Sequence, residues 1–552
     1  MLNYCANGPS GYTINNSLRF RSSASAYLNR TPASATNQKT WTYSLWLKRG
    51  ALSTVQNLLV IGSNVTGQQS TQFGLNNDNT IQFFDGLAGV STSIIFDTTQ
   101  VFRDPSAWYH FVVVLDTSQA TASNRAKIYV NGSQITAFST ATYPAQNATG
   151  NINSNVIQNI GRRPATGTEY LDGYLAEMYM ITGQALTPSS FGSTNSITGV
   201  WQPAKYTGTY GTNGFYLPFS DIATTSGSNA GLGKDFSGNG NYFNTNNISV
   251  TAGSTYDAMI DSPTMGYSAT QPVGNYCTLN PLNVYSSYSI TNTNLNFSLT
   301  ASSGTYFARS TFGISSGKWY WEVTPSDVGG GPNIFVGIQL TSYNSTSATQ
   351  DNMASGYAYW ANAEKFNGTT RTAYGATYTN NDVIGVAFDA DSGTITFYKN
   401  NSSQGTAFTG ISGEYTPTIA LSAGGTSRTI AGAINFGQRP FSYTPPSGYV
   451  ALNTYNLSTP TIIQGNRYMD ATLWTGNGPT SQVIVNAAQF KPDLIWAKNR
   501  SSTRKHNLYD SVRGTLKRLV SNDAVAEDTP GDSLTAFNSN GFTVGSEGDL
   551  NG

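Results

Sequence analysis

A strand–turn–strand pattern occurs twice in this chain and limits the folds available to it. The first copy spans residues 111–135 (FVVVLD, a polar loop, AKIYVNGSQI), and the second spans 383–404 (VIGVAFD, ADSG, TITFYKNNSSQ). In each copy a mostly apolar strand, typical of burial on both faces, precedes a strand with alternating apolar residues. Each copy closes on an Asn turn, Asn131-Gly132 or Asn400-Asn401, where Asn and Gly accept a positive φ. The duplication predicts two large antiparallel sandwiches in tandem.

The composition supports an all-β protein. Charged residues form only 11% of the 552 residues and aromatic residues form 12%. Aromatic strands joined by Ser, Thr, Asn and Gly turns are typical of β-rich chains. No apolar run approaches the roughly 18 residues of a membrane-spanning helix, so membrane insertion is not expected. The net charge of zero argues against a nucleic-acid partner.

The termini and the cysteines add three expectations. The N-terminus MLNYCANGPSGY lacks the basic and apolar segments of a secretory signal. Cys5 and Cys277 are far apart and have no metal-type spacing, so they form no disulfide framework. The sequence stops shortly after the strand-like GFTVG, which predicts that the last domain is incomplete here.

Four regions are expected along the chain. Residues 1–200 are predicted to form the first sandwich, with a short helical turn after Thr187-Pro188. Residues 201–280 form a connecting region whose short strands pack on a neighbour, and residues 281–445 form the second sandwich. Residues 446–552 form a separate β-rich module, which holds eight of the 29 Lys and Arg residues between Lys491 and Arg518.

Three segments resemble known families. The strand around Trp46, the segment WYHF (108–111) and the segment DGYLAE (172–177) resemble the laminin-G-like, concanavalin A-like sandwich. The series GKWYWEV (317–323), FVGI, DVIGVAFDADSGTITFYKNN and YTPTIAL resembles the SPRY domain over nearly the whole second sandwich. SPRY domains are binding modules that use loops at one edge, so the resemblance implies binding without identifying a ligand. The phrases DLIWAKNR and LYDSVRG resemble a module of unassigned role in structural proteins of marine bacteriophages.

No catalytic residue can be assigned. The chain has only two histidines, and His110 lies within a strand among core positions, which disfavours a Ser-His-Asp hydrolase. Residues 313–317 fit G-x-S-x-G, but a strand follows where a nucleophile elbow needs a helix. Glu177 and Glu322 each stand alone among apolar neighbours, so no carboxylate pair for a glycosidase can be named. The sequence therefore predicts a protein that is not an enzyme, with a polysaccharide depolymerase as an alternative.

Two groups of residues are candidates for ligand binding. Tyr357, Tyr359 and Trp360 precede a loop that leads to Arg371, and such side chains stack on sugars or anchor interfaces. The alternative is that these aromatic residues alternate into the core. The second group is a basic patch that would grip an anionic glycan or a phosphorylated surface, or else forms a solvated face or a subunit contact. Its residues are Lys498, Arg500, Arg504 and Lys505.

No metal site is predicted. Asp235, Asn239 and Asn241 place oxygen atoms in one tight turn, which suits calcium but is also the usual composition of an exposed turn. No cofactor is therefore expected, and calcium is kept as a minor alternative.

The resemblances imply a bacteriophage virion protein, made in the host cytoplasm and carried on the tail or the capsid surface. We expect a tail fibre or adhesin whose loops attach to the host surface, and the alternative is a capsid fibre or decoration protein. Its expected partners are identical copies (a trimer in the case of a tail fibre), other virion proteins and a host-surface glycan or protein. Linked copies would gain avidity from many weak sites.

Overall fold

A computed structural model describes residues 11–62, 70–86, 94–164, 167, 169–196, 198–223, 225–268, 271–331, 333–348, 352–459, 461–462 and 464–552. Cys5 lies outside these residues. The chain divides into two compact units, one formed by residues up to 194 with 201–458, and the other by 195–200 with 459–552. The all-β prediction is confirmed, because helix in the described residues is limited to α1 and four short 3-10 turns. These elements are α1 (Gly548–Asn551), η1 (Ser22–Ala24), η2 (Ala122–Asn124), η3 (Pro188–Ser190) and η4 (Gly465–Arg467).

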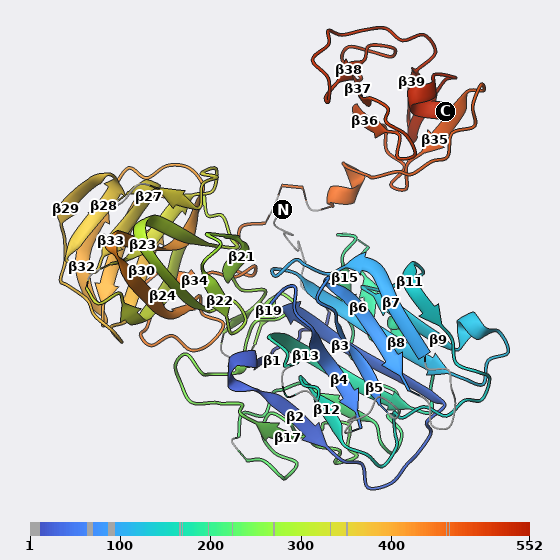
Figure 1. The fold of residues 1–552 in the computed structure, drawn as a ribbon, viewed down its shortest axis with the longest axis horizontal. Helices are drawn as coiled ribbons and strands as arrows, with labels where there is room; N and C mark the ends of the chain where they lie inside the picture. Colours follow the sequence, from blue (N-terminus) through green and yellow to red (C-terminus); the bar gives the residue numbers. More distant parts are fainter. Residues whose placement is uncertain are drawn as a thin grey trace. The chain divides into compact units, whose positions relative to one another are not determined.

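The first sandwich consists of two eight-stranded antiparallel sheets (Figure 1). One sheet contains β1 (Ser17–Phe20), β3 (Thr40–Arg49), β8 (Trp108–Asp116), β9 (Ala126–Val130), β10 (Ser133–Gln134), β13 (Gly173–Thr182), β16 (Phe215–Leu217) and β18 (Ala258–Met259). Its order is β10-β9-β8-β3-β13-β1-β18, and β16 pairs with β13. The other contains β2 (Tyr27–Arg30), β4 (Gln56–Ile61), β5 (Thr71–Leu75), β6 (Thr80–Asp85), β7 (Ile94–Val101), β11 (Phe138–Thr142), β12 (Gln158–Ile160) and β17 (Asn244–Asn246). Its order is β11-β7-β6-β5-β4-β12-β2-β17.

Strands β8 and β13 are buried on both faces because each face has its own cover. On the inner face, Phe111, Val113 and Met180 pack in the core between the two sheets. On the outer face, a second aromatic cluster covers the sheet, partly from the connecting region. Its buried members are Val112, Val114, Tyr179, Ile181, Phe191, Tyr206 and Tyr216.

The connecting region is built into the first sandwich. Its strands β16, β17 and β18 pair with β13, β2 and β1 respectively. Phe215, Leu217 and Phe219 are buried in the core of that sandwich. Two small ladders complete this part, β14 (Gly192–Thr194) with β15 (Trp201–Pro203) and β19 (Gly266–Tyr267) with β20 (Pro272–Val273). The predicted helical turn is present as η3, although the Thr187 side chain does not cap it.

The second sandwich is assembled from one hydrogen-bonded set of fourteen strands, coloured from green to orange in Figure 1. The strands are β21 (Leu279–Val284), β22 (Ser289–Thr291), β23 (Asn296–Ser310), β24 (Lys318–Val328), β25 (Ile334–Leu340), β26 (Ser347–Ala348), β27 (Met353–Trp360), β28 (Glu364–Gly368), β29 (Thr370–Ala373), β30 (Ile384–Asp389), β31 (Thr394–Lys399), β32 (Ser402–Phe408), β33 (Tyr415–Asn435) and β34 (Val450–Ala451). The main order is β29-β28-β27-β25-β33-β24-β30-β31-β32. The long strand β33 pairs with β23, β24 and β25, so it joins both layers.

The duplicated hairpins have the backbone that their sequences predict. Asn131 and Gly132 have φ of 47° and 83°, and Asn400 and Asn401 have φ of 47° and 70°. These values match the paired positive φ angles of a type I′ turn, the two-residue turn that suits the twist of a hairpin.

The C-terminal unit contains two three-stranded sheets around a small core. The sheets have the orders β35-β40-β39 and β36-β37-β38. Their strands are β35 (Gln482–Val485), β36 (Leu494–Lys498), β37 (His506–Asp510), β38 (Leu519–Val520), β39 (Leu534–Asn538) and β40 (Gly541–Val544). Across the described residues, no helix has the length and apolar character needed to cross a bilayer.

Candidate ligand-binding groove at the sandwich junction

The aromatic candidates of the second sandwich do not form one exposed surface. Tyr359 is fully buried, and its ring contacts those of Tyr374, Tyr378 and Phe397. Trp360 is also buried, stacked on Phe335. Both therefore belong to the core, as the alternative interpretation of the sequence holds, and the proposal that they contact a ligand must be corrected.

The remaining two candidates differ in their surroundings. Tyr357 is half-buried, and its ring contacts Phe408 and Tyr415. Arg371 is exposed on β29. Tyr357 and Tyr359 share one face of β27 and Trp360 lies on the other, and both faces are covered, so alternation does not leave any of the three fully exposed.

Two of the four residues of the basic patch have acidic neighbours. Arg504 lies 3.5 Å from Asp549, and Lys505 lies 3.7 Å from Asp523. Lys498 donates to the backbone carbonyls of Asn499 and Ser502, whereas Arg500 is exposed. Three further basic residues of this unit have acidic partners, in the pairs Arg513–Asp510, Lys517–Glu527 and Arg518–Asp528. This pairing favours the interpretation of a charge-balanced surface.

The Asp235 loop uses its polar groups to hold itself together. The Asp235 carboxylate accepts hydrogen bonds from the backbone N–H groups of Tyr216, Ser237 and Asn241, and from the Ser237 hydroxyl. Asn239 and Asn241 turn their side-chain nitrogens toward backbone carbonyls, including that of Gly214. In the part of the chain that the structure describes, no three His, Cys, Asp or Glu residues gather as metal ligands. The oxygen atoms of the Asp235 carboxylate are therefore occupied by N–H and O–H donors, whereas a cation needs oxygen atoms that are free to coordinate it.

His110 is buried between two tryptophan rings and cannot activate a nucleophile. Its Nε2 lies 2.9 Å from the Ser44 hydroxyl, and its Nδ1 accepts a hydrogen bond of 3.0 Å from Trp201 Nε1. Because an indole N–H only donates, Nδ1 is the acceptor and the imidazole proton is on Nε2. The ring therefore donates to Ser44 and does not accept its proton. Burial also lowers the pKa of His110 to about 3.

The two isolated glutamates are structural. Glu177 is buried and accepts hydrogen bonds from the hydroxyls of Tyr12, Tyr179 and Tyr216. Glu322 is buried and accepts from the backbone N–H groups of Ser442 and Tyr443 and from the hydroxyl of Tyr320. Burial raises the pKa of both carboxyl groups. Among the described residues, the hydrogen-bond partners of both glutamates are hydroxyl and amide groups.

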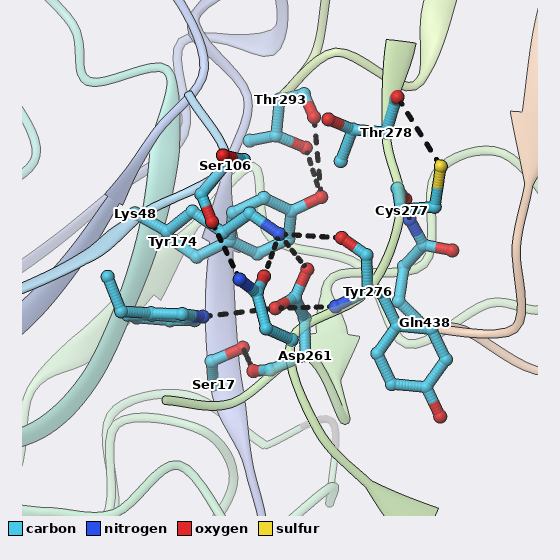
Figure 2. Close-up of polar contacts among 12 residues, drawn as sticks. Ser17, Lys48, Ser106, Tyr174, Asp261, Tyr276, Cys277, Thr278, Thr293 and Gln438 are labelled. Carbon is cyan, nitrogen blue, oxygen red and sulfur yellow. Dashed lines mark hydrogen bonds and ion pairs between the residues drawn. The ribbon is translucent and has the colours of Figure 1, made fainter. Parts of the chain in front are cut away.

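A buried polar network joins the first sandwich to the connecting region (Figure 2). Lys48 Nζ lies 2.7 Å from Asp261 Oδ2, and both side chains are completely buried. The same ammonium donates to Asn275 Oδ1 and to the backbone carbonyl of Tyr276. Asp261 Oδ1 in turn accepts from Trp108 Nε1 at 3.1 Å. All three ammonium protons have acceptors, so the buried charge is fully satisfied.

A second set of contacts reaches the second sandwich from the same place. The backbone N–H groups of Asn292 and Thr293 donate to the buried Asp172 carboxylate, and the Thr293 hydroxyl donates to the Tyr174 hydroxyl. The Gln438 side chain donates to the backbone carbonyl of Cys277, and the thiol of this cysteine is free and buried (Figure 2). The two sandwiches are therefore held together by buried hydrogen bonds, which fix the loops on either side of the junction.

A groove of about 580 Å³ lies at this junction. The first sandwich supplies the loop Arg103–Ser106. The second supplies residues from β21 and β23, from the loops after β23 and β25, and from the start of β33. The lining residues are Arg103, Asp104, Pro105, Ser106, Asn280, Leu282, Asn283, Arg309, Ser310, Thr311, Phe312, Gly313, Thr341, Glu414 and Thr416. Seven of the fifteen have hydroxyl or amide side chains, and the two arginines are balanced by two acidic residues, Asp104 and Glu414.

The groove retains hydrogen-bonding groups that the fold does not use. Within the described residues, the exposed Arg103 guanidinium has no ion-pair partner, and the Ser310 hydroxyl is buried without a hydrogen bond. By contrast, Arg309 is fully engaged, with Gln339, Asn283 and the Ser345 carbonyl as acceptors. Such a surface suits a polar, largely neutral ligand with many hydroxyl groups. Sequence reasoning missed it because five separate chain segments form it and none carries a ligand-binding motif.

Comparisons with known families agree with the two sandwiches. The model described as the concanavalin A-like lectin/glucanases superfamily matches residues 22–190, and the SPRY domain model matches residues 318–434. A domain of unknown function (DUF7483) matches residues 464–552. Among curated proteins, the ATP-dependent RNA helicase DDX1 of Xenopus laevis is 29% identical over 150 residues, which cover 26% of this chain. The match spans only 18% of the helicase.

Solved structures give similarly partial matches. The SPRY domain of human HERC1 is 18% identical, covers 28% of this chain and 97% of its own, and has a TM-score of 0.25. Domains LG4-5 of the mouse laminin alpha1 chain are 10% identical, cover 78% of this chain and 89% of their own, and have a TM-score of 0.26. Likenesses of this size carry no functional conclusion. From the family models, the chain contains a concanavalin A-like domain followed by a SPRY domain.

Proposed function

We propose that this chain is a bacteriophage virion structural protein, a tail fibre or adhesin that attaches to the host surface. The observation that carries the proposal is the polar groove between two sandwiches held by a buried network. A rigid groove lined by hydroxyl and amide groups suits a surface glycan, because little ordering entropy is lost on binding. The groove carries two carboxylates, but Asp104 accepts hydrogen bonds from Ser106 and Glu414 accepts one from the Thr341 hydroxyl. Because both carboxylates are engaged in local hydrogen bonds, attachment without cleavage is the activity that we infer.

Binding to surface polysaccharides tests this function. The purified full chain is applied to an array of bacterial surface polysaccharides, beside the Arg103→Glu variant and the matched variant Arg371→Glu. Both arginines are exposed, so neither change should affect folding. We expect retention on a subset of glycans, at least a tenfold loss for Arg103→Glu and no loss for Arg371→Glu. Binding by Arg103→Glu equal to that of the unmodified chain would refute the groove as the binding site. A loss of binding in Arg371→Glu alone would instead assign the binding site to the edge of the SPRY domain.

The rival functions make different predictions. A depolymerase would release new reducing ends from the retained polysaccharide, whereas an adhesin leaves it intact. A capsid fibre or decoration protein would be labelled over the head of the particle, whereas a tail fibre would be labelled at the tail. Antibody labelling of intact particles in the electron microscope separates these two locations. Light scattering of the purified chain tests whether it is a trimer.

A further inference from the structure

A second cavity, of about 370 Å³, lies beside the edge strand β18 of the first sandwich. It is lined from the first sandwich by Asn15 and Asn16, from the connecting region by Ser220 and Gln271, and from the second sandwich by Gln438 and Arg439. The described lining contains amide, hydroxyl and apolar groups and a single charged side chain, that of Arg439. None of its lining residues is acidic. The volume is in the range of sites that hold small ligands.

Arg439 is buried and has no carboxylate partner. It is only 5% exposed, and its Nη2 donates to the backbone carbonyl of Ile434 at 3.2 Å. Among the described residues, no Asp or Glu lies within ion-pair distance of it, and its Nη1 is buried without a hydrogen bond. A buried arginine normally has a carboxylate or a full set of acceptors, because an unpaired buried donor costs about 1–3 kcal/mol.

The neighbouring arginines show the contrast. Arg19 and Arg21 share the buried carboxylate of Asp257, at 3.0 and 2.8 Å. Arg19 also leaves its Nη1 buried without a partner. Burial, together with the positive charge of Arg19, lowers the pKa of Arg439 to about 9, although the more distant carboxylates of Glu322 and Asp257 act in the opposite direction. An anion placed at Arg439 would relieve both penalties.

We propose that this cavity binds the carboxylate of an acidic sugar, with Arg439 as the group that recognises the charge. The planar guanidinium matches a carboxylate in a two-pronged hydrogen bond. The amide and hydroxyl groups of Asn15, Asn16, Ser220 and Gln271 suit the hydroxyl groups of the same sugar ring. This inference deepens the proposed attachment function and rests on it for its biological meaning, but not for the binding itself.

Calorimetric titration of the full chain tests the site with galacturonate, galactose and sulfate as probes. We expect saturable binding of galacturonate, at least tenfold weaker binding of galactose, and a tenfold or greater loss of galacturonate affinity in Arg439→Gln. Arg439 is buried, and its loss can also unfold the chain. Ser220→Trp therefore provides a second variant, since it blocks the cavity from an exposed position. The matched control is Ser287→Trp, which is exposed and lies outside the cavity.

Each outcome decides the proposal. Unchanged galacturonate binding in folded Arg439→Gln or in Ser220→Trp would overturn it, as would the absence of saturable binding. Sulfate that binds as tightly as galacturonate would mean a general anion site and would overturn the assignment to a sugar acid. Arg103→Glu serves to separate the two proposals. It should weaken retention on the polysaccharide array at least tenfold but leave the galacturonate titration unchanged, so either proposal can fail without the other.

Discussion

Replacing Lys48 by methionine is expected to destabilise the chain by about 3–5 kcal/mol, because it leaves the Asp261 carboxylate buried without its counter-charge. Both side chains of the pair are completely buried at a separation of 2.7 Å. The substitution also removes the donor to Asn275 and to the Tyr276 carbonyl. Asp261→Asn leaves the reverse defect, a buried ammonium with only neutral acceptors, and should cost about 3 kcal/mol.

The double variant Lys48→Met, Asp261→Asn distinguishes a charge pair from simple packing. Without either charge, the double variant should lose about 2–3 kcal/mol less than the sum of the single losses. Urea unfolding of the full chain measures all four species, and Lys318→Met is the matched control. Lys318 makes a 3.1 Å ion pair with Asp389, but its own side chain is 47% exposed, so its loss should cost much less than that of Lys48. Single losses that add to within about 0.5 kcal/mol would refute the coupled buried pair.

Three further predictions concern the first sandwich. The pKa of His110 is lowered from 6.5 to about 3, so the free energy of unfolding should fall as the pH drops below 6.5, by about 2 kcal/mol at pH 5. Urea unfolding at several pH values should show a weaker pH dependence for His110→Gln. An unchanged pH dependence in this variant would contradict the assignment to His110. Gly132→Ala places a Cβ within 2.5 Å of the Trp201 ring at a φ of +83°, so thermal unfolding should show a loss of stability above about 1 kcal/mol. The control Gly410→Ala has a similar φ of +74° but lies in open space, so its loss of stability should be smaller. Asp235→Ala should lower the stability by about 2 kcal/mol or more, because it leaves buried N–H groups without an acceptor. Calcium or a chelator should leave the melting temperature of the native chain unchanged, and a calcium-dependent melting temperature would show that the loop binds the ion.

Local patterns in the sequence were enough to predict the strands and turns. Strand periodicity and the Asn turns depend on neighbours within a few residues, and Asn131 and Asn400 have the predicted backbone. The aromatic candidates failed for a related reason. Tyr359 and Trp360 have residue types that suit both a sugar platform and a core, and only the three-dimensional packing separates the two roles.

The groove and the second cavity could not be predicted, because their residues are brought together from distant segments. Arg103 and Asn283 lie in different sandwiches but line one groove. Arg439 follows the last long strand of the second sandwich, yet it lines a cavity with Asn15 from the beginning of the first. A single sequence has no periodicity that links such positions. The junction that aligns them depends on Lys48 and Asp261, which are separated by 213 residues.

The position of these sites follows from how the first sandwich is covered. The outer face of its sheet is occupied by aromatic side chains such as Tyr206 and Tyr216, and Trp201 stacks there on His110. A ligand could reach that face only by displacing buried rings, at a cost of about 2–3 kcal/mol for each large apolar side chain exposed. The polar hollows beside the junction can be filled without displacing any core residue. Binding at the junction is therefore the less costly arrangement, and it makes the affinity of both sites depend on the buried network around Lys48.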